Sequence, residues 1–70
     1  MTDEIVTVNG EARPVAGRTV GWLVDDLGLS PGGRGVAVAL DGDVVRRDDW
    51  PSVVLRAGQR VEVLSAIQGG

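Results

Sequence analysis

Hydrophobic and polar residues alternate near the start of the chain, as they do in a half-buried β-strand. Residues 5–8 read Ile-Val-Thr-Val, and Asn9-Gly10 follows them as the preferred pair for a two-residue hairpin turn. Residues 11–15 are then predicted to form the returning strand. Pro14 has no N–H to donate to a sheet, so this second strand should lie at a sheet edge or end there.

A helical period replaces the alternation after residue 18. Four apolar residues fall at i, i+3, i+4 and i+7, which places them on one face of a helix. They are Val20, Leu23, Val24 and Leu27. Thr19 is a good N-cap and Gly28 a plausible left-handed C-cap, so a short helix is predicted between them.

Alternation returns in the second half of the chain. Residues 36–40 alternate large with small side chains, Asp41-Gly42 is a second hairpin turn, and residues 43–46 form a short returning strand. The final strand is predicted at residues 60–66, with Val61 and Val63 on one face.

Three connecting segments are less regular. Residues 30–35 are glycine-rich, which suits either a phosphate-binding loop or a plain connector; the phosphate-loop pattern is incomplete, so a connector is favoured. Residues 47–51 resemble a polar turn from which Trp50 folds back over the core, and residues 53–55 are short and apolar.

The predicted order is strand, strand, helix, strand, short strand, strand, which favours an α+β roll: a mixed sheet with one helix packed on one face. Residues 1–66 form one domain and residues 67–70 a C-terminal tail. The inward-facing residues of these elements should make the core. They are Val6, Val8, Val20, Leu23, Val24, Leu27, Val36, Val38, Leu40, Val61 and Val63.

The face of the sheet that the helix leaves open is a second feature of the prediction. It should carry Thr7, Ala37, Ala39, Glu62, Leu64 and Ala66. A flat, partly apolar patch on a small domain suggests a docking surface, although scattered exposed alanines are also ordinary.

Composition excludes several function classes. The 70 residues include no cysteine and no histidine, which argues against a thiol nucleophile, a Ser-His pair and a usual zinc site. The net charge is −3 and all seven basic residues are arginine, so nucleic-acid binding is not expected. No apolar run suggests a membrane span or a signal peptide, and a soluble cytoplasmic protein is predicted.

The chain ends in Ile67-Gln68-Gly69-Gly70, directly after the final strand. Two glycines make a thin and adaptable segment that could thread a terminal carboxylate into another protein. A frayed glycine tail without function is the alternative.

One ordered set of residues runs along nearly the whole chain. Its members are Val8-Asn9-Gly10-Glu11, Thr19-Val20, Leu23, Leu27, residues 35–42, Val44-Val45, Arg47, Trp50, Val61-Glu62-Val63 and residues 66–70. This set resembles the β-grasp, or ubiquitin-like, fold of order ββαββ. Within that fold it resembles the ThiS family of thiamine-biosynthesis sulfur carriers.

The resemblance implies a protein substrate, not an enzyme. A partner adenylyltransferase would activate the carboxylate of Gly70 with ATP and magnesium that the partner binds, so this chain would hold no cofactor or metal of its own. A sulfur donor such as a cysteine desulfurase would supply persulfide sulfur and leave a thiocarboxylate on Gly70. Thiazole synthase would then use that sulfur to build the thiazole ring of thiamine.

The resemblance also implies roles for particular residues. Ile67, Gln68 and Gly69 would thread the tail into the partner. The partner docking face would comprise Ala37, Ala39, Leu64 and Ala66. Trp22 departs from the family pattern, and it would either lie against the sheet edge or make an added partner contact.

Two rival function classes stay open at this point. One is a carrier with the same chemistry for another acceptor, as in molybdopterin or cysteine synthesis, or a ubiquitin-like protein modifier. The other is a structural β-grasp interaction module.

Overall fold

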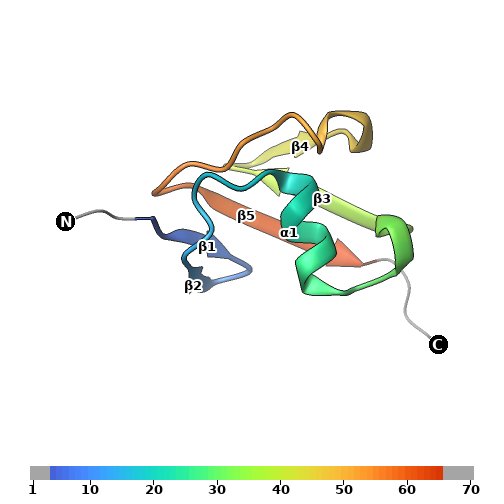
Figure 1. The fold of residues 1–70 in the computed structure, drawn as a ribbon, viewed down its shortest axis with the longest axis horizontal. Coiled ribbons are helices and arrows are strands. Elements are labelled where there is room, and N and C mark those ends of the chain that lie inside the picture. Colours follow the sequence, from blue (N-terminus) through green and yellow to red (C-terminus); the bar gives the residue numbers. More distant parts are fainter. Residues whose placement is uncertain (1–3, 66–70) are drawn as a thin grey trace.

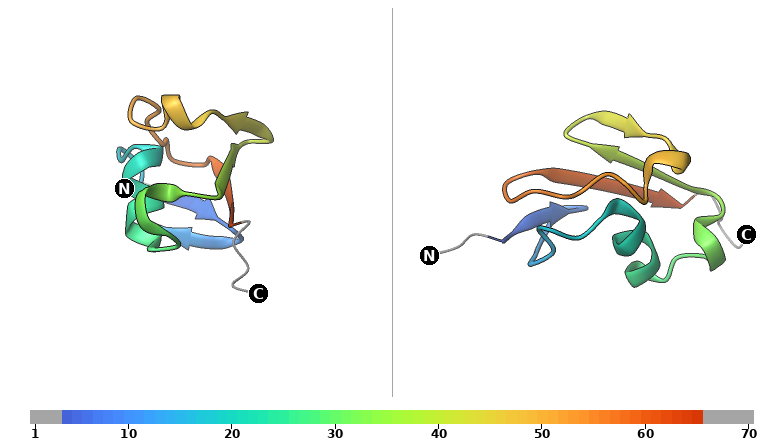
Figure 2. Two further views of the ribbon diagram at one scale, coloured as in Figure 1. Left: turned by 90° about the vertical axis from the view of Figure 1, so that its right-hand side faces the viewer. Right: turned by 45° about the horizontal axis from the view of Figure 1, so that its top comes forward.

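In the computed structural model, which describes residues 4–65, a five-stranded mixed sheet carries one α-helix on one face (Figures 1 and 2). Two short 3₁₀ turns, η1 and η2, connect the helix and strands of the second half. In chain order the elements are β1 (Val6–Val8), β2 (Glu11–Arg13), α1 (Val20–Leu27), η1 (Pro31–Gly33), β3 (Val36–Leu40), β4 (Asp43–Val45), η2 (Arg47–Asp49) and β5 (Arg60–Ser65). The predicted α+β roll and the predicted order of strands and helix are therefore confirmed.

The last strand lies at the centre of the sheet. The strand order is β2-β1-β5-β3-β4, so β5 has β1 on one side and β3 on the other. The β1–β5 pair is parallel, with Val8 opposite Val61, and the remaining pairs are antiparallel. Parallel strands such as β1 and β5 need a crossover connection between them. Helix α1 is part of that connection and covers one face of the sheet (Figure 2).

Both predicted hairpin turns form, and their backbone angles explain the residues found there. Asn9 and Gly10 have φ of 51° and 85°, and Asp41 and Gly42 have φ of 50° and 90°. Two consecutive positive φ values define the turn that suits the twist of a two-residue hairpin, and Asn, Asp and Gly adopt it most readily.

The second strand is shorter than predicted. β2 ends at Arg13, immediately before Pro14, and it is an edge strand as the proline required. Val15 does not continue the ladder. Its N–H donates to the carbonyl of Arg13 at 2.9 Å, and its side chain turns into the core with 6% of its surface exposed.

Helix α1 has the two caps that the sequence predicted. The hydroxyl of Thr19 accepts a hydrogen bond from the N–H of Trp22 at 3.0 Å. Gly28 has φ of 65°, the left-handed conformation of a glycine C-cap. At eight residues α1 is too short to cross a membrane, and residues 4–65 contain no other α-helix.

The start of α1 is tied to the segment after η2. Val20 donates its N–H to the carbonyl of Val53 at 2.9 Å, and Gly21 donates to the carbonyl of Trp50 at 3.0 Å. These donors have no partner inside a helix, so residues 50–53 supply the acceptors that the first turn lacks.

The core fills the space between α1 and the sheet. Eight of the eleven predicted core residues are buried, while Leu27, Val36 and Leu40 are only partly buried against them. Three core members were absent from that set. They are Val15, Trp50 and Leu55, of which Trp50 had been predicted to fold back over the core.

Candidate functional site

Strand β5 presents a different surface to each side of the sheet. Val61 and Val63 point into the core with 0% and 4% exposure, whereas Leu64 has 67% of its surface exposed. Glu62 is exposed on the same side as Leu64. Successive side chains of a strand point to opposite faces, so the even-numbered residues of β5 lie on the face that α1 leaves open.

The register of the sheet brings the predicted docking residues together. Ala37 lies opposite Leu64, and Ala39 lies opposite Glu62. Directly opposed residues share a face, so Ala37, Ala39 and Leu64 lie side by side as the sequence suggested. Ala66, the fourth predicted member, lies outside the described residues.

One apolar member of this face was missed. Val44 of β4 lies opposite Ala39 and is 77% exposed. The two-residue turn at Asp41-Gly42 already implies this pairing, because it sets Leu40 opposite Asp43 and therefore Ala39 opposite Val44. We call Ala37, Ala39, Val44 and Leu64 the open face.

A shallow groove continues from the open face toward β1. It has a volume of 560 Å³ and is lined by Thr7, Asn9, Gly10, Arg60, Glu62 and Leu64. Arg60 and Glu62 give this side polar character beside the apolar strip. This side of the sheet is therefore apolar at the open face and charged toward β1, as in protein interfaces that have an apolar centre and a polar rim.

The backbone at the centre of the sheet is held by an asparagine side chain. Asn9 accepts a hydrogen bond from the Val63 N–H at 2.8 Å and donates to the Val63 carbonyl at 3.1 Å. The backbone pairing of β1 with β5 ends at Val8 opposite Val61, so the side chain of Asn9 extends the contact between the two strands. This holds β5 in place two residues before its end.

The predicted reacting segment follows β5. The strand ends at Ser65, opposite Val36 of β3. Ile67, Gln68, Gly69 and Gly70 lie outside the described residues, and their predicted roles stay predictions.

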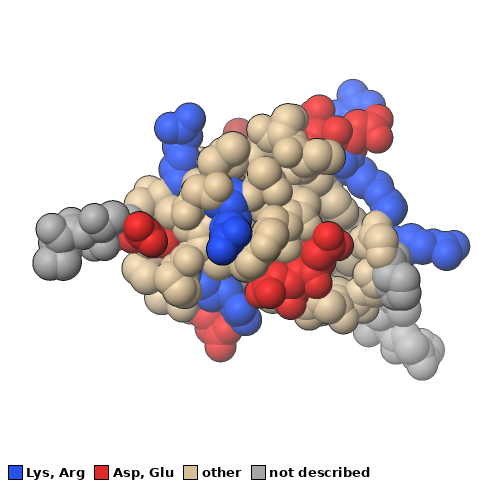
Figure 3. Space-filling view, in the orientation of Figure 1, with Lys and Arg blue, Asp and Glu red and all other residues tan. Residues whose placement is uncertain are grey.

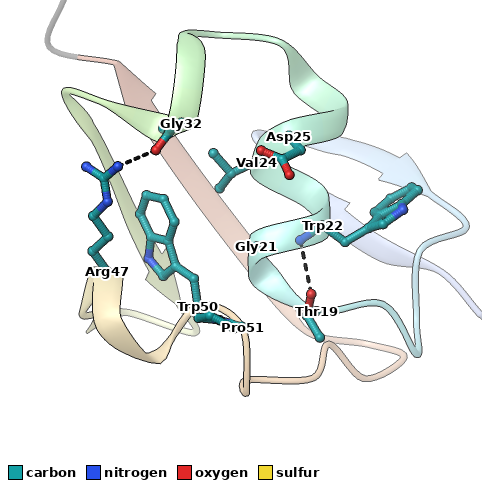
Figure 4. Close-up of a pocket in the computed structure, with 10 residues that line it drawn as sticks. Thr19, Gly21, Trp22, Val24, Asp25, Gly32, Arg47, Trp50 and Pro51 are labelled. Atoms are coloured by element: carbon teal, nitrogen blue, oxygen red, sulfur yellow. Dashed lines mark hydrogen bonds between the residues drawn. The ribbon is translucent and has the colours of Figure 1, made fainter.

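A separate cleft of 470 Å³ lies on the helix side of the molecule, between α1 and the turns η1 and η2 (Figure 4). Trp50 lies across it, its indole N–H donating to the Val45 carbonyl at 3.1 Å, and Arg47 donates to the Gly32 carbonyl. Gly33 is buried against the Trp50 ring. These glycines thus serve packing and loop geometry, which supports the connector interpretation of residues 30–35.

Trp22 also lines that cleft, and Figure 4 shows its indole on the side of α1 away from Trp50. Trp22 is 37% exposed, and the guanidinium carbon of Arg18, which precedes the helix, lies 4.5 Å from the ring centroid. A cation over an aromatic face stabilises both side chains on the surface. The added partner contact considered for Trp22 stays a prediction.

Within residues 4–65 no three carboxylates, histidines or cysteines converge as metal ligands would. The features that the structure does assemble are an apolar surface and the strand that leads to the chain's C-terminal segment. Such an arrangement suits a protein that another protein recognises.

Comparisons with known proteins agree with this geometry. A model described as the ThiS family matches residues 6–70. The chain is 36% identical over 66 residues to the sulfur carrier protein ThiS of Thermus thermophilus. The alignment covers 94% of this chain and 100% of the relative. The fold is similar, with a TM-score of 0.73 and 30% identity, to the crystal structure of a thiamine biosynthesis protein (ThiS) from Geobacter metallireducens. That match covers 94% of this chain and 99% of the other. The predicted β-grasp fold is confirmed.

Proposed function

This chain belongs to the ThiS family, and we propose that it is a sulfur carrier of thiamine biosynthesis. The observation that carries the proposal is a family match that runs through to Gly70, on a fold whose central strand leads into that segment. The chain acts as a protein substrate, and Gly70 is its reacting residue.

The proposed chemistry takes place on the carboxyl group of Gly70. The carboxylate attacks the α-phosphate of ATP on an adenylyltransferase, which forms an acyl-adenylate and releases pyrophosphate. The terminal sulfur of a persulfide on a sulfur donor displaces AMP and forms an acyl disulfide. A thiol then cleaves the S–S bond of that acyl disulfide, leaving a thiocarboxylate on Gly70 and a disulfide on the donor side. Thiazole synthase takes the sulfur from this thiocarboxylate.

The sequence has the residues that this chemistry needs and lacks those that would disturb it. A carboxylate is a poor electrophile, so activation must come from the Mg-ATP site of the partner. The chain contains no cysteine that could divert the sulfur and no lysine whose amine could attack the acyl-adenylate. Gly69 and Gly70 carry no side chain, which suits passage into a narrow channel.

The open face supports docking outside that channel. Leu64 and Val44 are 67% and 77% exposed, and the small Ala37 and Ala39 between them keep the surface flat. Exposed valine and leucine on a sheet of so small a domain favour a contact with another protein. We propose that this contact is made with the adenylyltransferase while residues 66–70 enter its active site.

Intact mass spectrometry tests the proposal. Incubation with the cognate adenylyltransferase, ATP and a sulfur donor should raise the mass by about 16 Da, because sulfur replaces one oxygen. No gain in mass with an active partner would support a structural module instead. Transfer onto a lysine of another protein would support a modifier.

Blocking the carboxyl group gives a second test. One alanine added after Gly70 should abolish the mass gain and leave the free energy of unfolding unchanged. The matched control is one alanine added before Met1, which should leave the mass gain intact. Full activity with the C-terminal addition would refute a role for the carboxyl group of Gly70.

A further inference from the structure

Two arginines lie at the end of the sheet where β5 ends. Arg34 lies two residues before Val36, the first residue of β3, and Val36 pairs with Ser65 at the end of β5. On the other side of β3, Val45 pairs with Val38, so the same register continued by one residue sets Arg46 beside Ala37 of the open face. Figure 3 shows arginine side chains projecting from this end of the molecule.

The loop that carries Arg34 is held firmly. Ser30 donates its hydroxyl to the Arg34 carbonyl at 2.6 Å, and Arg47 donates to the carbonyl of Gly32. Gly33 packs so closely on Trp50 that an added Cβ would lie 2.6 Å from the ring. Contacts from η2 therefore fix the backbone from which Arg34 extends, next to the end of β5 (Figures 1 and 2).

Neither guanidinium is neutralised within the described part of the chain. Arg34 and Arg46 are both exposed, and the one ion pair among residues 4–65 joins Arg13 to Glu11. Asp48 and Asp49 follow closely in sequence, yet no ion pair connects them to either arginine. Two exposed cations that form no ion pair within residues 4–65, on a chain with net charge −3, are free to attract an acidic surface of another protein.

We propose that Arg34 and Arg46 bind carboxylates of the adenylyltransferase around the opening that receives residues 66–70. This inference rests on the proposed function and adds to it the charge of the partner surface. Arg46 borders the apolar open face and Arg34 lies near the end of β5, so together they form a basic rim at this end of the sheet. Arginine suits this task because its planar fork pairs with carboxylates in two-point geometry.

Chain length places this contact at the opening and not at the reacting centre. Five residues span at most about 17 Å when fully extended, so Gly70 can lie that far beyond Ser65. Arg34 and Arg46 lie at the near end of this distance. We therefore assign them to positioning the carrier and not to contact with the ATP phosphates.

Steady-state kinetics of the thiocarboxylate mass gain test the inference. The double variant Arg34→Gln/Arg46→Gln should raise the KM for the carrier about tenfold at low salt, roughly threefold for each exposed ion pair lost, with kcat unchanged. The difference from the unmodified protein should shrink as ionic strength rises, because salt screens exposed charges. The Arg34→Lys/Arg46→Lys variant keeps both charges and should retain most of the salt dependence.

Arg56→Gln is the matched control. Arg56 is also exposed, but it precedes the start of β5 and so lies at the opposite end of that strand. Its loss should leave the KM within about twofold of the unmodified value. Equal effects of the control and the double variant would overturn the inference, as would a rise in the KM for ATP in place of the carrier.

The result separates two failures. If the unmodified chain gains no mass with an active partner, the proposed function is wrong. If it gains mass and the double variant has an unchanged KM and salt dependence, only the basic rim is wrong.

Discussion

Replacing Gly33 with alanine probes the contact between the loop before β3 and Trp50. Gly33 has φ of 73°, in the left-handed region that alanine adopts only with strain. An added Cβ would also lie 2.6 Å from Trp50 Cζ3, 3.3 Å from Trp50 Cη2 and 3.4 Å from Val24 Cγ1. The nearest of these distances is well inside van der Waals contact, so the ring or the loop must move.

The expected loss of stability has two parts. The positive φ costs a non-glycine residue about 1 kcal/mol. Forcing an extra methyl group against a packed ring adds about 1–3 kcal/mol. A domain of this size has a free energy of unfolding of roughly 4–10 kcal/mol, so Gly33→Ala should remove a large share of it.

Gly28→Ala separates strain from collision. Gly28 has φ of 65°, and a Cβ there would meet nothing within 4 Å. Urea unfolding should therefore show a loss of about 1 kcal/mol for this control and about 2–4 kcal/mol for Gly33→Ala.

A second background tests the cause of the difference. Trp50→Phe removes the outer ring atoms, and in that background the cost of Gly33→Ala should fall toward the control value. Equal losses for Gly33→Ala and Gly28→Ala in the unmodified background would refute the packing of Trp50 on this loop.

Three further substitutions test other parts of the structure. Thr19→Ala removes the acceptor for the Trp22 N–H and should lower the free energy of unfolding by about 1 kcal/mol; an unchanged urea midpoint would contradict the N-cap. Asn9→Gly keeps the positive φ but removes both bonds to Val63, so it should cost about 1–3 kcal/mol and speed amide exchange at Val63; unaltered exchange there would argue against the bridge. Leu64→Ser should change stability by less than about 0.5 kcal/mol, because the side chain is 67% exposed, while it raises the KM of the adenylyltransferase for the carrier; an unaffected KM would remove Leu64 from the docking face.

Local chemistry made much of the fold predictable. Asn9-Gly10 and Asp41-Gly42 form the turns that their side chains favour, and Thr19 and Gly28 cap the helix as expected. In each case the interaction that selects the residue lies within four positions along the chain. Such features are encoded in a short window and need no knowledge of the sheet.

The core residues that the sequence did not identify depend on distant contacts. Val15 is buried because the chain turns inward after Pro14, where a regular strand would have continued. Leu55 is buried because residues 17–18 pair with it: Gly17 donates to the Leu55 carbonyl and Leu55 donates to the Arg18 carbonyl, both at 2.8 Å. The residues next to Leu55 in sequence do not predict this pairing, because its partners lie almost forty residues away.

The candidate site was predictable to the extent that it follows from alternation. Ala37 and Ala39 share a face because they are two residues apart in β3, and Leu64 shares it because it lies opposite Ala37. That Val44 lies on the same face can be inferred only from the register of β3 and β4. The turn at residues 41–42 determines that register. The same register of β3 and β4 sets Arg46 beside Ala37. The basic rim could therefore be inferred only after these strands were paired.

Alternation along β5 also separates two tasks within one strand. Val61 and Val63 face the core and are held between β1 and β3, whereas Glu62 and Leu64 face outward beside the reacting segment. Substitutions on the outward side can therefore change recognition with little effect on stability. Substitutions on the inward side loosen the strand to which residues 66–70 are attached, and so they should impair both stability and delivery of Gly70 to a partner.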